Sequence, residues 1–264
     1  EKLFSRRSYA KMFSASLTYV LIVVPISVAL GLGSALLISS LRIGNELYKA
    51  IFFLPVMATL LAMAIVWEFA LNPIMGVVND ILRSGCDKRL IYGFFTGAWY
   101  GADPLQSWYG TACADKFPIW LGDKRYALGT IAFIGIWQGF GFNMVLYLAG
   151  LTSVPRELYQ AAHMDGADSA WERFKLVTWP MLGPTHVFVI TISSIRSFQV
   201  FDTVEALTEG GPSKSTYVMV YAMFEKGVRQ NLLGIGSAIT IVFLAFVLVL
   251  TLIQVYFVNR RVHY

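Results

Sequence analysis

Five long apolar stretches, each free of ionised side chains over most of its length, divide the chain. Crossing the hydrocarbon core of a membrane takes about 20 helical residues, and the backbone of a spanning segment must satisfy its own hydrogen bonds. The stretches are long enough for this, and they lack the strict alternation of β-barrel strands. The pattern predicts an all-α, polytopic transmembrane helical bundle with spans near residues 14–39, 51–71, 127–150, 184–206 and 234–257.

Composition supports a membrane protein. Of the 264 residues, 56% are hydrophobic and only 14% are charged, whereas soluble domains have roughly 45–50% apolar and about 25% charged residues. The first apolar stretch far exceeds the core of a signal peptide and lacks a small-residue cleavage pattern. Because the sequence begins with Glu1 rather than Met, we expect a further segment ahead of it.

Five spans would place the two ends of the chain on opposite sides of the membrane. Loops 40–50 and 151–183 then share one side, and loops 72–126 and 207–233 share the other with the N-terminal arm. The second side carries more Lys and Arg, which by itself favours the cytosol, but the positive-inside rule weakens for long loops. Charge therefore does not decide the orientation.

The long loop 72–126 contains both cysteines, Cys86 and Cys113, and many aromatic side chains. A disulfide between the cysteines would persist only in an oxidising compartment and so outside the cytosol; two free thiols are the alternative. The aromatic side chains could stack on sugar rings or dock a partner. We favour a self-packed cap with an interfacial aromatic belt.

Segment 153–180 has the signals of a helix–turn–helix. Ser153 can cap a first helix that has Pro155 in its first turn. Gly166 supplies a left-handed stop. Ser169 and Glu172 have the spacing of a capping box for a second helix.

Pro180 is expected to close that second helix. An amphipathic helix pair between two spans is typical of a segment that fills a groove on a partner protein. A helix pair lying on lipid is the alternative, but Asp165, Asp168 and Glu172 suit a lipid surface poorly.

The same segment resembles the EAA loop of ABC importer permeases. The matching elements are Gln160-Ala161-Ala162, Gly166 and Val177-Thr178-Trp179-Pro180. The leading Glu of the family pattern is Gln160 here, and the gap from Gly166 to Pro180 is one residue longer. A second run, Phe201-Asp202 followed by Leu207-Thr208-Glu209-Gly210-Gly211-Pro212, resembles carbohydrate permeases related to the maltose and glycerol-phosphate systems, in particular the maltose-F type.

The resemblance covers nearly the whole chain and implies much about its surroundings. It implies six core spans, so that a first span is missing, and a single transmembrane domain over 1–264. It implies a second homologous permease, two ATP-binding cassette subunits that hold ATP and Mg, an extracytoplasmic solute-binding protein and the bacterial inner membrane. The 153–180 loop would be cytosolic and loop 72–126 an extracytoplasmic insertion. The ATPase-coupling residues would be Glu157, Gln160, Ala161, Ala162, Asp165, Gly166 and Ala167.

Arg196 is the most informative single residue. It lies about 12 residues, or ~18 Å, into the fourth predicted span, where an ionised side chain is costly unless it faces water or a counter-charge. It either binds an anionic group of the solute in the pathway, or pairs with Asp202, Glu205 or an acid of a partner subunit. In the resembling permeases the third and fourth spans contact the sugar. This implies the pathway residues Gln138, Gly139, Phe142, Asn143, Ser193, Arg196 and Ser197.

The sequence therefore predicts a permease subunit of an ATP-driven, binding-protein-dependent importer that works by alternating access. Its solute would be a saccharide, and Arg196 suggests an acidic one, such as a uronate oligosaccharide or a sugar or glycerol phosphate. The alternative is an ion-coupled secondary transporter, which would place acids at the membrane midplane, where this chain has a cation. No P-loop, catalytic residue set or metal-ligand spacing is present. We expect no enzyme activity, cofactor, metal or nucleic-acid partner.

Overall fold

The computed structural model describes residues 7–41, 44–79, 81 and 118–259, and within them the chain is helical without strands. The α-helices are α2 (Arg7–Ser40), α3 (Asn45–Met57), α4 (Leu60–Ala70), α8 (Ala127–Thr152), α9 (Arg156–Met164), α10 (Ala170–Arg173), α11 (Trp179–Met181), α12 (Gly183–Phe198), α13 (Asp202–Leu207), α14 (Met219–Phe224) and α15 (Leu233–Asn259). Two π-helical turns, η1 (Phe174–Thr178) and η2 (Glu225–Arg229), continue α10 and α14. The all-α prediction is confirmed.

Four helical stretches are long and apolar enough to cross a membrane, and there are five if one bent pair of helices is counted as a single span. The four are Tyr9–Ser40, Ala127–Thr152, Gly183–Leu207 and Leu233–Ile253. They match the predicted spans 14–39, 127–150, 184–206 and 234–257. The stretch Gly183–Leu207 is interrupted after Phe198, and the short helix α13 resumes the run at Asp202.

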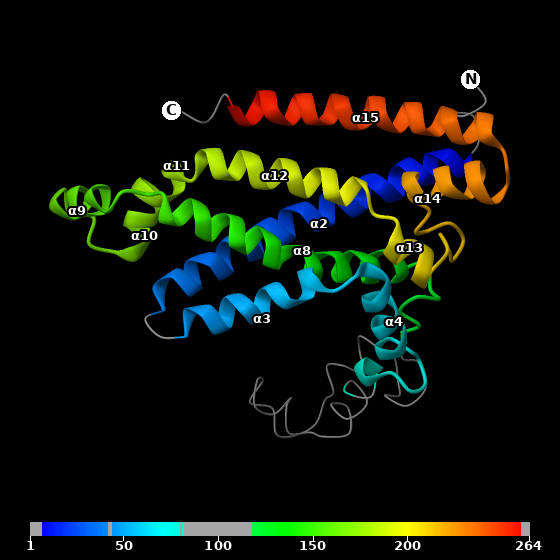
Figure 1. Cartoon of the computed structure of the whole chain (residues 1–264), viewed down its shortest axis with the longest axis horizontal. Helices are drawn as coiled ribbons and strands as arrows, with labels where there is room; N and C mark the ends of the chain where they lie inside the picture. Colours follow the sequence, from blue (N-terminus) through cyan, green and yellow to red (C-terminus); the bar gives the residue numbers. More distant parts are fainter. Residues whose placement is uncertain (1–6, 42–43, 80, 82–117, 260–264) are drawn as a thin grey trace, which may run out of the picture.

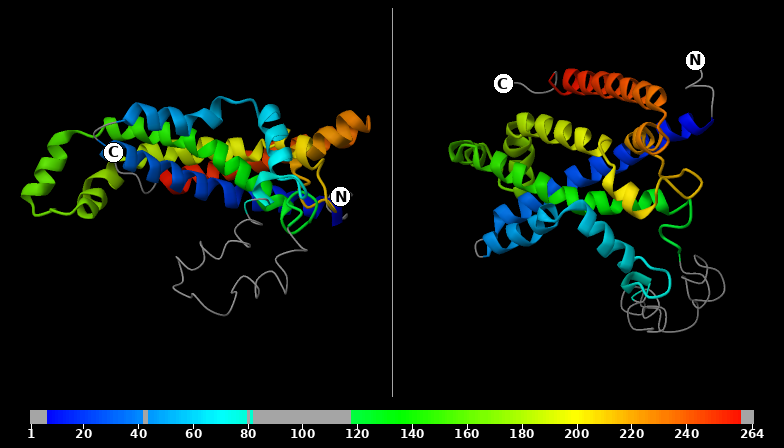
Figure 2. Two further views of the ribbon diagram at one scale, coloured as in Figure 1. Left: turned by 90° about the horizontal axis from the view of Figure 1, so that it is seen from below. Right: turned by 45° about the vertical axis from the view of Figure 1, so that its right-hand side comes forward.

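The second predicted span, 51–71, is not one straight helix. It consists of α3 and α4, bent by 97° at a short break, and Figure 2 shows α4 turned away from α3. Ala58 is extended, and the Thr59 side chain accepts a hydrogen bond from the Ala62 N–H and so caps α4. Pro55, inside α3, cannot donate a backbone hydrogen bond. Neither the cap nor the missing N–H can be read from the pattern of apolar residues.

The spans run back and forth along one axis, with α2 beginning at one end of the bundle and α15 ending at the other (Figure 1). Helices α9 and α10 lie at the end where α15 finishes, whereas α13 and α14 lie at the opposite end. The two ends of the described chain are thus on opposite sides, as five crossings require.

Helix α8 is the centre of the bundle and packs against α2, α3 and α12. Glycines permit this close packing: a Cβ at Gly31 of α2 would lie 2.6 Å from the Asn143 Cβ, and one at Gly141 would lie 2.1 Å from the Phe52 carbonyl oxygen. Gly33 and Gly139 meet nothing within 4 Å. Close approach therefore explains Gly31 and Gly141, but not Gly33 and Gly139.

The predicted insertion 72–126 is only partly described. Cys86, Cys113 and the aromatic residues between them lie outside the described residues, so the disulfide and the cap remain predictions. At its described ends, Trp120 Nε1 donates a 2.8 Å hydrogen bond to Oδ1 of the buried Asn79. The beginning and end of the insertion are thereby joined.

Candidate substrate cavity and coupling helices

A cavity of about 510 Å³ lies among α2, α3, α8 and α12. The seven residues predicted from the sequence as the pathway all line it. Helix α8 supplies Gln138, Gly139, Phe142 and Asn143, and helix α12 supplies Ser193, Arg196 and Ser197. The other lining residues are Tyr19, Val23, Ser27, Val56, Ala58, Gly135, Gln199, Val200, Phe201, Asp202 and Thr203.

Helical periodicity explains how two apolar spans present this face. Residues three or four apart share one side of a helix, which holds for Gly135, Gln138, Gly139 and Phe142 on α8. Gly135 keeps that face shallow where α2 approaches, because a Cβ there would lie 2.2 Å from the Tyr19 hydroxyl oxygen.

Arg196 extends into the cavity against an aromatic ring. Its Cζ lies 3.8 Å from the centroid of the Phe142 ring, which is a cation–π arrangement across two helices. No ion pair to Arg196 is present among the described residues. Glu205, one of the predicted partners, instead pairs with Arg229 at 2.5 Å. The Arg196 side chain is exposed, so its charge is available to a solute.

Asn143 joins three spans beneath the cavity surface. It is buried, accepts a 2.9 Å hydrogen bond from Ser193 Oγ and donates a 3.4 Å hydrogen bond to Ser27 Oγ. Gln138 Nε2 donates to the Ala58 carbonyl at the break between α3 and α4, at 3.5 Å. These polar side chains therefore also fix the cavity walls, because a buried polar group without a partner is costly.

The two helices α9 and α10 project beyond the spans as a separate hairpin (Figure 2). Gly166, at the turn, has φ of 88°, which confirms the predicted left-handed stop. The Ala167 N–H donates back to the Ala162 carbonyl at 2.9 Å. Both alanines are buried in the turn, and the other predicted coupling residues are exposed: Glu157, Gln160, Ala161, Asp165 and Gly166.

The predicted capping box at α10 is also confirmed. Ser169 Oγ accepts from the Glu172 N–H at 3.1 Å, and the Ser169 N–H donates to the Glu172 carboxylate at 3.0 Å. The latter hydrogen bond holds the pKa of the Glu172 carboxyl below its usual range. The carboxylate is therefore ionised at neutral pH and caps the helix.

Two local predictions about this segment are wrong. Ser153 does not cap α9, because its hydroxyl donates to the Ala149 carbonyl at 3.1 Å and so ends α8; Pro155 occupies the N-cap position. Pro180 does not close the second helix. The residues before it, in η1, are already helical, and the chain continues through the short α11 into α12.

A small core makes the hairpin one unit. Val154, Ala162, Ala167 and Val177 form it together with Tyr159, whose hydroxyl lies 2.9 Å from Thr178 Oγ1. Large apolar side chains remain exposed on its outside. They are Met164 (86% exposed), Trp171 (70%) and Leu176 (63%).

Residues 4–263 match the family model described as "Binding-protein-dependent transport system inner membrane component". The chain belongs to this family. It is a multi-pass permease component of a binding-protein-dependent importer, which confirms the predicted class over the secondary transporter.

Known members of the family are similar over most of the chain. The sn-glycerol-3-phosphate transport system permease protein UgpA of Brucella abortus is 29% identical over 256 residues, covering 96% of this chain and 77% of UgpA. The probable ABC transporter permease protein YurN of Bacillus subtilis is 28% identical over 213 residues, covering 81% of this chain and 64% of YurN.

Two crystal structures share the fold. One is of a bacterial ABC transporter involved in the import of the acidic polysaccharide alginate, with a TM-score of 0.78 and 21% identity over 98% of this chain and 82% of that chain. The other is of a bacterial alginate ABC transporter in complex with an alginate pentasaccharide-bound periplasmic protein, with a TM-score of 0.78 and 20% identity over 98% of this chain and 81% of that chain.

The contribution of α2 and of the segment after α12 to the cavity of this permease was not predicted from the sequence. Tyr19 and Ser27 are polar positions inside the first apolar stretch, and both are buried at the cavity. Asp202 lines the same cavity. Their polarity inside an apolar run could have identified them as candidates.

Proposed function

We propose that this protein is one of two homologous transmembrane subunits of an ATP-driven importer for an acidic saccharide in the bacterial inner membrane. A binding protein delivers the solute, and the cavity opens alternately to the two sides. The observation that carries the choice of solute is the Arg196 guanidinium, which lies against the Phe142 ring in the cavity without an acidic partner among the described residues.

The cavity chemistry supports a sugar that carries an anionic group. Its volume of about 510 Å³ is in the range of small-molecule sites, roughly 300–1,000 Å³. An aromatic face packs against a sugar ring, and the side chains of Gln138 and Ser197 can exchange hydrogen bonds with hydroxyls. The planar guanidinium of Arg196 matches a carboxylate or phosphate in a bidentate manner. The named solutes of the relatives, glycerol phosphate and alginate, are likewise anionic.

The hairpin of α9 and α10 is the proposed contact to a cytosolic ATPase. Two such ATPases bind ATP with Mg and hydrolyse the ATP, and this chain takes no catalytic part. The exposed residues of α9 and the turn, together with Trp171 and Leu176, would lie in a cleft of the ATPase. The small hairpin core supports this role, because a self-packed unit transmits a push as a rigid body.

The experiment is purification of the complete transporter followed by uptake in proteoliposomes. We expect a second permease and an ATP-binding subunit to co-purify with this chain. Uptake of a labelled uronate oligosaccharide should require ATP and the binding protein, and it should exceed uptake of the neutral oligosaccharide of equal length. ATP-independent uptake by this chain alone would refute the importer assignment, and faster uptake of the neutral sugar would refute the solute class.

A further inference from the structure

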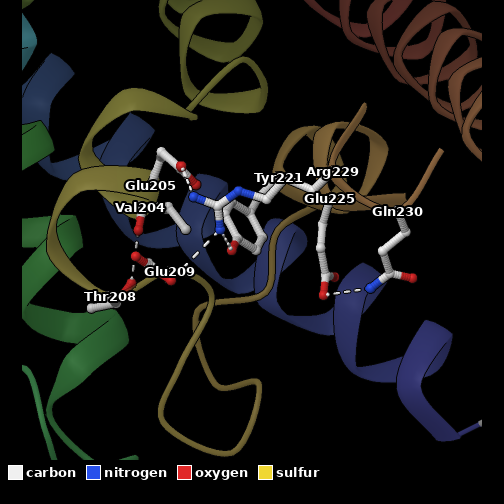
Figure 3. Close-up of polar contacts among 8 residues, drawn as sticks. All are labelled: Val204, Glu205, Thr208, Glu209, Tyr221, Glu225, Arg229 and Gln230. Carbon is white, nitrogen blue, oxygen red and sulfur yellow. Dashed lines mark hydrogen bonds and ion pairs between the residues drawn. The ribbon is translucent and has the colours of Figure 1, made fainter. Parts of the chain in front are cut away.

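A polar cluster centred on Arg229 lies at the end of the bundle opposite the α9–α10 hairpin (Figure 3). The Arg229 guanidinium pairs with Glu205 at 2.5 Å and with Glu209 at 3.6 Å. It also donates to the Tyr221 hydroxyl at 3.5 Å, and its Cζ lies 5.5 Å from the centroid of the Phe224 ring. One cation thus joins α13, the loop after α13, and the α14–η2 unit.

The helix that Arg229 contacts carries part of the cavity wall. Phe201, Asp202 and Thr203 line the cavity, and Glu205 follows them in α13. The Glu205 N–H donates to the Phe201 carbonyl at 2.8 Å, so the charged side chain and the cavity residues are parts of one helical turn. A displacement of Glu205 therefore displaces the cavity wall.

The α14–η2 unit, which contains Arg229, is held in place by hydrogen bonds. Within the α14–η2 unit, Glu225 accepts hydrogen bonds from the Tyr217 hydroxyl and from Gln230. The Met219 N–H donates to Ser16 Oγ of α2 at 2.8 Å, in a buried contact. The unit that contains Arg229 is thus attached to α2, whereas α13 is joined to the chain through non-helical residues on both sides.

Several contacts hold α13. It packs against α4, and its Val204 is buried in the main hydrophobic core. The preceding Phe201 ring makes an edge-to-face contact with the Phe224 ring at 5.0 Å, and Arg229 supplies the ionic contact. The Glu205 side chain is only 24% exposed, whereas that of Glu209 is 70% exposed. A pair at a partly buried site is screened less than one in water. Glu205 is therefore the main partner.

We propose that Arg229 is a positioning residue for the transport cavity: through Glu205 it holds α13 against the α14–η2 unit and so fixes the cavity wall at 201–203. The proposal rests on the proposed function for its transport readout but on geometry alone for the placement of α13. Arg229 does not touch the solute. Its loss leaves the cavity chemistry intact and loosens one wall.

The first readout is the accessibility of Thr203, which is 5% exposed. Thr203→Cys is introduced with Cys86 and Cys113 replaced by serine, and labelling by a thiol reagent is timed in membranes containing the complete transporter. We expect Arg229→Gln and Glu205→Gln each to accelerate labelling by roughly two- to fivefold, the population change expected for the loss of a partly exposed ion pair. Lys226→Gln is the matched control, because Lys226 is on the same turn and its side chain bonds to Gln230 rather than to α13.

The second readout is uptake of the labelled acidic oligosaccharide. Both variants should raise the half-saturating solute concentration by roughly three- to tenfold with a smaller effect on the maximal rate. The double variant Arg229→Gln with Glu205→Gln should change no more than either single variant, since the two residues act as one pair. A purely structural role would lower the amount of assembled transporter and its maximal rate without this pattern.

Unchanged labelling of Thr203→Cys in both variants would overturn the proposal. Labelling needs no solute, so it still decides the position of α13 if the parent transporter takes up no saccharide, in which case the proposed function fails by itself. Where Arg229→Gln assembles poorly, Glu205→Gln carries the same expectation, because it removes the charge at constant volume.

Discussion

Replacement of Arg196 tests the choice of solute most directly. Arg196→Met removes the cation and the guanidinium fork but keeps an apolar side chain that can remain against Phe142. Arg196→Lys keeps the charge but loses the bidentate geometry and part of the stacking. Both variants preserve the hydrogen bond between Ser193 and Asn143 beneath the cavity, so the walls should stay in place.

The magnitude follows from the environment of the guanidinium. A hydrogen bond to a charged group contributes about 1.5–3 kcal/mol, which is roughly a 10- to 150-fold change in an equilibrium constant. Since Arg196 is exposed to the cavity, water screens the interaction and favours the lower end of that range. We expect Arg196→Met to reduce the preference for the acidic over the neutral saccharide about tenfold, and Arg196→Lys to reduce it by a smaller factor.

The assay compares initial uptake rates of a uronate oligosaccharide and its neutral counterpart in proteoliposomes that contain the complete transporter. Lys49→Met is the control, because Lys49 lies at the start of α3 and pairs with Glu46. The ratio of the two rates should fall in the Arg196 variants and remain constant in the control. An unchanged ratio in an assembled Arg196→Met transporter would refute the assignment of an anionic solute to this residue.

Substitutions at three further positions test the fold around the two sites. Gly166→Val places a β-branched residue at a φ of 88° and should cost about 1–3 kcal/mol of strain, seen as loss of ATPase co-purification, while Gly166→Asn should retain more ATPase because Asn tolerates this conformation. Asn143→Leu leaves the buried Ser193 hydroxyl without its acceptor, and should lower the thermal unfolding temperature in detergent through a loss of about 1–3 kcal/mol. Gly31→Val sets side-chain atoms against the Asn143 Cβ and should separate α2 from α8, measured as reduced assembly. A wild-type result in any of these three measurements would contradict the corresponding contact.

The fold was predictable from the sequence because crossing a membrane imposes a long apolar run, and such runs are visible without any knowledge of packing. The break between α3 and α4 was not, since a charge-free run continues across Thr59 and Pro55. There the Thr59 hydroxyl caps α4 and Pro55 lacks a backbone N–H. These two local effects interrupt the helix despite the apolar pattern. Ser153 shows the opposite error: a residue suited to begin α9 instead ends α8.

The candidate cavity was predictable only in part. Spacing and resemblance identified the lining residues on α8 and α12, because each set repeats along a single helix. The contribution of α2 depends on how closely two helices approach, which is decided by Gly31 facing Asn143. The Arg196–Phe142 contact likewise joins different helices, and no pattern along one helix predicts it.

The helical backbone around Pro180 connects the hairpin to the helix that lines the cavity. The helical run of α10 and η1 continues across Pro180, and the chain from Ala170 to Phe198 has no extended break: the Leu182 N–H donates to the Thr178 carbonyl at 3.0 Å, and the His186 N–H donates to the Leu182 carbonyl at 2.8 Å. Backbone hydrogen bonds thus connect the hairpin to the helix that carries Arg196. Under the proposed mechanism, an ATPase that displaces the hairpin also displaces that helix, and its cavity face moves relative to α2. The α13 segment at the far end, held by Arg229, then determines how much of that motion reaches the cavity wall at 201–203.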